Sequence, residues 1–210
     1  MITRQKLKNH FLTMLFLSIV FFVSAYLILI SAKKYYSPSE ITARLNSEIL
    51  FSLSDLDKEI DIITSAGFDN EATLWNFINT NNKNSFKERG VEILVYEKDS
   101  LKYWTNNVFA APIFLDSLSF SYDIVISGSG YYLVKSRKTG PYTIVALQLL
   151  RYNYKYSNEY LPSGFYKRFS APSNVGILFE PGKNNITSPE GKFLCSLSFD
   201  EPFELQIWLQ

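Results

Sequence analysis

The sequence predicts an α+β protein that carries an N-terminal transmembrane helix, in which a long helix precedes an antiparallel sheet. Three observations predict this class. An uncharged apolar run extends from Phe11 to Ala32, apolar residues recur every three or four positions from Ile41 to Ile63, and short β-branched and aromatic runs begin at Val91. Helices followed by strands that are joined through short turns are typical of the α+β class.

The composition is that of one folded domain with a membrane segment. Of the 210 residues, 47% are hydrophobic and 16% aromatic, which is more than a disordered chain carries. The formal net charge is +1 and no basic stripe with interleaved aromatic residues is present, so we expect no nucleic-acid partner. Cys195 is the only cysteine, which excludes an intrachain disulfide and a thiolate-rich zinc site.

The apolar run from Phe11 to Ala32 is long enough to cross a bilayer, since about 22 residues at helical rise span ~33 Å. A cleaved signal peptide is the alternative, because Val23-Ser24-Ala25 has the small residues that a signal peptidase accepts. The apolar run continues beyond that point to Ile30, which favours a retained anchor.

Basic residues in the short N-terminal tail indicate the orientation of this anchor. Arg4, Lys6 and Lys8 favour a cytoplasmic N-terminus, although Lys33 and Lys34 on the other side reduce the asymmetry. We therefore expect a cytoplasmic tail at 1–10, a transmembrane helix at 11–32 and an extracytoplasmic domain at 33–210. This places the protein in the inner membrane with the domain in the periplasm.

A long helix is predicted directly after the membrane segment. Ser37 is a cap, Pro38 suits the first helical position, and Gly67 is a left-handed stop. The apolar stripe consists of Ile41, Leu45, Ile49, Leu53, Leu56, Ile60 and Ile63. Such a stripe either pairs with a second copy, as a stalk, or packs on its own domain. A shorter helix is predicted from Glu71 to Ile78, and a polar loop from Asn79 to Asn82.

The rest of the chain predicts strands joined by tight turns. The turn at Gly128-Ser129-Gly130 lacks the further glycine and the helix of a dinucleotide fingerprint. Asn185-Ile186-Thr187 is interpreted as a loop. The predicted strands are Val91–Glu97, Leu101–Thr105, Tyr122–Ser127, Tyr131–Lys138, Tyr142–Tyr152, Val175–Phe179, Phe193–Phe199 and Phe203–Leu209.

Two stretches resemble the extracytoplasmic PAS-like (Cache-like) domains of certain bacterial two-component sensor histidine kinases. One is the hairpin from Gly90 to Asn107, with its acidic turn and its aromatic pair before Asn. The other runs from Gly130 to Arg137, continues at Tyr142 to Leu150, and is followed by Asn158-Glu159-Tyr160-Leu161-Pro162.

The resemblance implies an input domain that relays an external stimulus across the membrane, as a homodimer, to a kinase core and a response regulator. In that family a second membrane helix, a His-containing dimerisation helix and an ATP-binding domain follow, and this chain holds none of them. It reaches Glu204–Gln210 about where that helix is expected. We thus expect no cofactor here, and ATP with Mg²⁺ only in the kinase core. The stimulus, a small molecule or a protein, is left open.

The chain offers little catalytic chemistry of its own. His10 is the only histidine and lies at the membrane boundary, so a Ser-His or Cys-His pair and imidazole metal ligands are missing from the predicted domain. The acids Asp55, Asp57, Glu59 and Asp61 are interpreted as a solvated helix face. We therefore expect neither a catalytic residue nor a metal site in these residues.

A ligand pocket on the sheet is the remaining candidate site. Arg or Lys would hold an anion and aromatic side chains would line the wall. The candidates are Tyr103, Trp104, Tyr131, Lys135, Arg137 and Tyr142. The competing interpretation is that the aromatics are half-buried core and the cations point to water. A membrane-anchored binding or assembly protein without kinase output is the alternative function, and an anchored enzyme is the weakest hypothesis.

Overall fold

The computed structural model describes residues 2–35, 37–65, 71–82, 85–115, 123–173 and 175–199. Two compact units make up the chain, Met1–Ile41 with Glu201–Gln210 and Thr42–Asp200. The first unit contains helix α1 (Ile2–Tyr35). Its segment His10–Ser31 is 22 residues long, exposed throughout and apolar enough to cross a membrane, as the sequence predicts.

Helix α2 (Pro38–Ser65) confirms the predicted long helix and its start. The Ser37 Oγ accepts a hydrogen bond from the Glu40 amide at 3.3 Å, which satisfies one of the free N–H groups of the first turn. All members of the predicted apolar stripe are buried, with at most 1% of each side chain exposed. The helix ends at Ser65, and the predicted stop at Gly67 lies outside the described residues.

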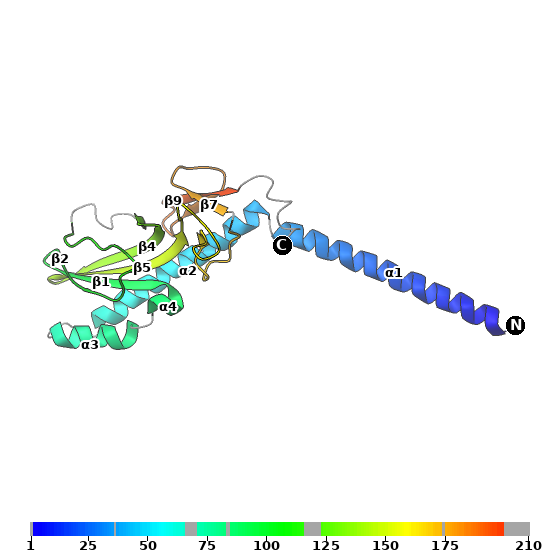
Figure 1. Cartoon of the computed structure of the whole chain (residues 1–210), viewed down its shortest axis with the longest axis horizontal. Coiled ribbons are helices and arrows are strands. Elements are labelled where there is room, and N and C mark those ends of the chain that lie inside the picture. The colour runs from blue at the N-terminus through cyan, green and yellow to red at the C-terminus, as the bar shows by residue number, and fades with distance from the viewer. Residues whose placement is uncertain are drawn as a thin grey trace. The chain divides into compact units, whose positions relative to one another are not determined.

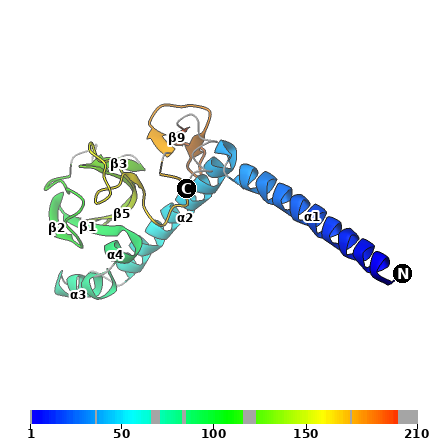
Figure 2. The same cartoon turned by 45° about the vertical axis from the view of Figure 1, so that its right-hand side comes forward.

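The stripe of α2 is buried within a single chain. Figures 1 and 2 show α2 running along one side of the sheet, so its apolar residues from Leu45 to Ile63 pack on their own domain. Of the two alternatives that the sequence leaves open, packing on the own domain is thus the one observed. A contact with a second copy would need another surface.

The main sheet is antiparallel and has β5 at its centre. Its strands follow the order β2-β1-β5-β4-β3, with a short β6 paired to the end of β5. Because β5 has a partner on each side, every residue from Ile144 to Arg151 is buried. The strands are β1 (Val91–Glu97), β2 (Ser100–Trp104), β3 (Ile124–Ser127), β4 (Gly130–Thr139), β5 (Tyr142–Tyr152) and β6 (Gly164–Phe165).

Two-residue turns fix the register of the predicted hairpins. In the β1–β2 turn, Lys98 and Asp99 have φ of 48° and 68°, which suits the mirror-image turns that match strand twist. Gly128 takes the same left-handed region at φ 56° between β3 and β4. These turns pair Glu97 with Ser100 and Ser127 with Gly130.

The main sheet has two buried faces. The helix face lies against α2 (Figure 2) and includes the buried residues Ile93, Val95, Leu133, Ile144 and Ala146. The aromatic face has its own core, built by alternate residues of the same strands together with Phe109. Its members are Leu94, Tyr96, Phe109, Tyr132, Val134, Val145, Leu147 and Leu149. Most residues of β1 and β5 are therefore apolar, on both faces of the sheet.

A second, three-stranded sheet joins the body through α2. It has the order β7-β9-β8, with β7 (Val175–Leu178), β8 (Asn185–Thr187) and β9 (Phe193–Phe199). The Thr187 amide donates to the Asn46 Oδ1 of α2 at 3.0 Å. The interpretation of Asn185–Thr187 as a loop is wrong, because these residues pair with β9 and bury Ile186.

Three further differences concern helix ends and short elements. Helix α3 (Glu71–Asn82) continues through the predicted polar loop at Asn79–Asn82. The Asn79 Oδ1 accepts a hydrogen bond from the Tyr103 hydroxyl at 2.7 Å, so tertiary contacts extend this helix. The sequence did not predict α4 (Ser85–Arg89) or β6. The predicted strand Phe203–Leu209 lies outside the described residues.

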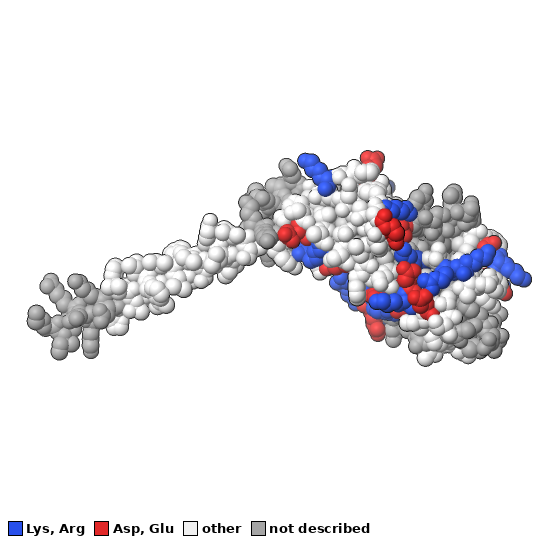
Figure 3. Space-filling model, turned by 180° about the vertical axis from the view of Figure 1, so that it is seen from behind, with Lys and Arg blue, Asp and Glu red and all other residues white. Residues whose placement is uncertain are grey.

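Ion pairs fasten α2 to the rest of the body. Arg89 bonds Glu59, Arg168 bonds Asp55, and Arg137 bonds both Asp57 and Asp61. The acids on this face, interpreted from sequence as solvated, are therefore paired, and their side-chain exposure ranges from 16% at Glu59 to 61% at Asp61. Figure 3 shows the mixed acidic and basic side chains over this side of the body.

Candidate functional site

The six residues predicted to line a pocket do not converge on one site. Tyr103 lies on the helix face, where its ring stacks on Trp75 of α3 with centroids 5.1 Å apart. Trp104 follows it at the end of β2, is 48% exposed, and donates from Nε1 to the Asn107 Oδ1 at 2.5 Å. Tyr142, at the start of β5, is half-buried. None of these three aromatic residues lines the cavity between β3 and the small sheet that is described below.

The two predicted cations belong to ion pairs. Lys135 Nζ lies 3.5 Å from the Asp123 Oδ1. Arg137 has 39% of its side chain exposed and lies 3.6 Å from Asp57, besides its bond to Asp61. An arginine that already meets two carboxylates has no free charge to hold an anionic ligand. The structure therefore favours a structural role for Arg137.

We expect Arg137→Ala to lower the free energy of unfolding by less than about 1 kcal/mol, because half-exposed ion pairs contribute ~0–1 kcal/mol. Chemical denaturation of the full chain in detergent measures this change. Lys138→Ala is the matched control, since Lys138 is the next residue of β4 and is exposed. A loss of several kcal/mol in Arg137→Ala alone would show that the contact with α2 is much stronger than its exposure suggests.

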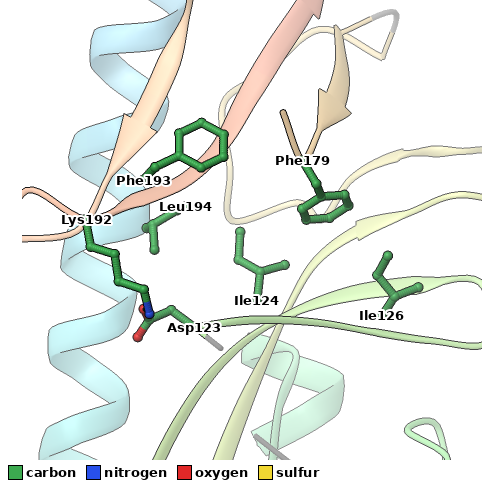
Figure 4. A pocket seen from close by; sticks show the side chains of 7 residues that line it. All are labelled: Asp123, Ile124, Ile126, Phe179, Lys192, Phe193 and Leu194. Atoms are coloured by element: carbon green, nitrogen blue, oxygen red, sulfur yellow. The ribbon is translucent and has the colours of Figure 1, made fainter. Parts of the chain in front are cut away.

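One cavity of about 380 Å³ lies between β3 and the small sheet. Figure 4 shows apolar side chains around it and, at one end, Asp123 facing Lys192. The lining residues are Asp123, Ile124, Ile126, Phe179, Lys192, Phe193 and Leu194. Two of the predicted residues border it. Lys135 pairs with Asp123, and the Tyr131 ring meets Phe179 edge-on, with centroids 5.6 Å apart.

The polar groups of this cavity are already paired. Asp123 bonds both Lys135 and Lys192, the latter at 3.3 Å, so the carboxylate is compensated without a ligand. The remaining walls are apolar and offer no orienting polar group. The cavity is large enough for a small molecule, but its lining offers no unpaired polar side chain that would favour one class of ligand over another.

A buried carboxyl on the aromatic face is the more distinctive site. Glu92 alternates with Leu94 along β1 and is fully buried, with 0% of the residue exposed. Its Oε2 accepts a hydrogen bond from the Phe109 amide at 3.2 Å. Its Oε1 has no hydrogen-bond partner among the described residues. A buried oxygen without a partner carries an energetic cost that a structural role alone does not require.

Aromatic side chains surround this carboxyl. The Phe109 and Tyr132 rings meet edge-on with centroids 5.1 Å apart. Tyr132 lies over Gly130, where a Cβ would come within 2.5 Å of its ring, so this position requires glycine. At the end of β5, Tyr152 and Tyr154 stack 5.3 Å apart and interact electrostatically with Tyr132. No ion pair joins Glu92 in the described part of the chain.

Burial changes the acidity of these groups. Desolvation raises the pKa of Glu92 from an ordinary 4.5 to about 7, although the amides of Phe109 and Asn106 act in the opposite direction. The pKa of Tyr132 is also raised, chiefly by desolvation, so its hydroxyl stays neutral. Burial thus brings the pKa of Glu92 close to neutral pH.

Sequence reasoning missed Glu92, although a signal was present. It is the one charged residue inside the apolar run Val91–Tyr96 of a strand that is buried on both faces. An acid at such a position must be neutral, paired or functional.

No family model matches the chain, no curated protein matches it, and no solved structure matches it. Among the described residues, no group of three or more His, Cys, Asp or Glu side chains is placed to hold a metal ion.

Proposed function

We propose that this chain is the extracytoplasmic input domain of a two-component sensor histidine kinase, with a PAS-like sheet held to the inner membrane by α1. The observation that carries the proposal is the burial of α2 by the sheet. This helix begins three residues after the apolar helix ends, and the stripe from Leu45 to Ile63 is buried by the domain. A change in the sheet would therefore act on the helix that leads to the membrane segment.

The topology of the sheet adds to this support. The sheet has the antiparallel order β2-β1-β5-β4-β3, and α2 runs along one of its faces (Figure 1). The opposite, aromatic face holds the buried carboxyl of Glu92, whose Oε1 has no hydrogen-bond partner among the described residues. Such a domain separates a face that meets the signal from a face that transmits it.

We expect protease added to intact spheroplasts to digest the domain while α1 stays in the membrane. The uncharged segment His10–Ser31 and the basic tail before it motivate this topology. Immunoblots with tags at each end of the chain follow both fragments. Protection of the domain would contradict the orientation, and a mature N-terminus at Tyr26 would contradict a retained anchor.

The reading frame downstream of Gln210 tests the kinase part of the proposal. We expect a second apolar segment, a dimerisation helix with a histidine, and an ATP-binding domain. A natural stop codon directly after Gln210 would contradict the kinase and favour an anchored binding or assembly protein.

A further inference from the structure

We propose that the Glu92 carboxyl is a proton-binding site, and that its protonation keeps the loop Asn106–Phe109 closed on the aromatic face. The site's ligand is thus the proton itself. The inference gives the proposed sensor a chemical signal, external acidity, and it rests on the proposed function only for that biological meaning.

The geometry joins the carboxyl to the loop. β2 ends at Trp104, and the chain then turns over β1 so that the Phe109 amide donates to the Glu92 Oε2. The Thr105 amide donates to the Ile93 carbonyl at 3.1 Å, which anchors the start of the loop. At its far end the Ala110 amide donates to the Ser127 Oγ of β3 at 3.2 Å. Glu92 therefore lies beneath a loop that is bonded to strands on two sides.

The other oxygen shows why the neutral form fits this closed state. The Glu92 Oε1 is buried and has no hydrogen-bond partner in the described part of the chain. In the ionised form both carboxylate oxygens carry the negative charge, so the part of the charge on Oε1 is poorly compensated. The titratable side chains in or packed against this cluster are the phenols of Tyr96, Tyr132, Tyr152 and Tyr166. Desolvation raises the pKa of each of them, so none brings a charge near pH 7. The loop contributes amides without a cation. A proton on the carboxyl removes the uncompensated charge.

Two effects oppose each other when Glu92 ionises. The amides of Phe109 and Asn106 bond a carboxylate more strongly than a neutral acid, which favours closure of the charged form. Desolvation disfavours the charge and is the larger effect, since the pKa is raised to about 7. A loop that opens and hydrates the carboxyl returns its pKa towards 4.5. Opening is therefore promoted as the pH rises.

Linkage sets the size of this effect. The difference between about 7 and 4.5 corresponds to a limiting increase in the opening constant of about 300-fold. Between about pH 5 and about pH 8 the same relation gives roughly 70-fold. Most of this change in the opening constant of the loop therefore falls between about pH 5 and about pH 8.

Hydrogen exchange of the Phe109 amide tests the switch in the full chain in detergent micelles. We expect the ratio of the wild-type rate to the Glu92→Gln rate to rise by about 70-fold from about pH 5 to about pH 8. The ratio removes the intrinsic pH dependence of exchange. Glu97→Gln is the matched control, because it removes a half-exposed carboxyl at the end of the same strand. Its rate should follow the wild type at every pH.

Three outcomes would overturn the inference. They are a flat ratio, the same change in Glu97→Gln, and a response that follows the amine concentration of the buffer instead of its pH. If Glu92→Gln does not fold, infrared titration of the wild type replaces it. We expect a protonated carboxyl band that disappears with a midpoint near pH 7, and its absence from about pH 5 upward would overturn the inference.

Failure of this switch is distinguishable from failure of the proposed function. A flat exchange ratio leaves the topology and reading-frame results untouched. Conversely, a stop codon after Gln210 removes the kinase and leaves a proton-sensitive loop in an anchored binding protein.

Discussion

The Ile60→Ala variant is expected to unfold with a free energy about 2–5 kcal/mol below that of the wild type. Ile60 lies within the buried stripe of α2 and has 0% exposure. Truncation removes apolar contacts and leaves a cavity between the helix and the sheet, and such changes cost ~2–5 kcal/mol in protein cores. Urea denaturation of the full chain in detergent, followed by tryptophan fluorescence, measures the difference.

The same helix supplies the control. Ile62 is two residues away and 52% exposed, so Ile62→Ala makes the same chemical change on the outer side of α2. We expect its effect to stay within ~0.5 kcal/mol. The loss in Ile60→Ala should not depend on protein concentration, because the stripe packs on its own domain. Equal losses in both variants, or a concentration-dependent loss, would contradict this packing.

Glu92→Gln is expected to gain stability relative to the wild type as the pH rises. The folded-state pKa of Glu92 is about 7 against an unfolded value near 4.5, so the folded state binds the proton more tightly. The stability from this group is fully present below about pH 4.5 and is lost as the pH rises through about 7. The difference between variant and wild type should therefore grow by about 3 kcal/mol from about pH 4.5 to about pH 8.

The difference in the free energy of unfolding between Glu92→Gln and the wild type, taken at each pH, reports on Glu92 alone, because the other carboxyls are present in both proteins. The acids of α2 that pair with arginines change the stability of both proteins alike. Glu97→Gln again serves as the control, with no comparable trend expected. A difference that stays constant with pH would show that Glu92 has the same pKa in the folded and unfolded states and would contradict its desolvated environment.

Elements that are set by local pattern were predictable from the sequence. The strands Val91–Glu97 and Tyr142–Tyr152 have the predicted bounds, and the α2 stripe is buried as its spacing indicates. In these segments β-branched runs, glycine turns and helical periodicity all favour one structure. The α+β class follows from them.

Elements that depend on distant partners were not predictable. The strand Asn185–Thr187 exists because β9 supplies its hydrogen bonds, and its own sequence is typical of a loop. In the last turn of α3, Asn79 bonds Tyr103 of β2, a residue 24 positions away. The pairing of Arg137 with α2 likewise joins residues 76 positions apart, which no local pattern reports.

The predicted pocket consists of aromatic and cationic residues on the strands, whereas the distinctive group in the structure is Glu92, an acid in an apolar strand. Its importance follows from burial on both faces of β1, which is a property of the assembled sheet. The sequence shows the acid, but only the fold shows that it is buried and that its Oε1 has no hydrogen-bond partner among the described residues.

Phosphoryl transfer from ATP to the product of the complete gene, in native membranes, tests whether this domain governs a kinase. We expect acid-labile phosphate on a protein that contains this chain. We also expect a changed labelling rate in Ile60→Ala and an unchanged rate in Ile62→Ala, because the buried side of α2 carries the coupling to the sheet. Absence of label, or identical labelling in the wild type and both variants, would contradict a sensory domain that governs a kinase through α2.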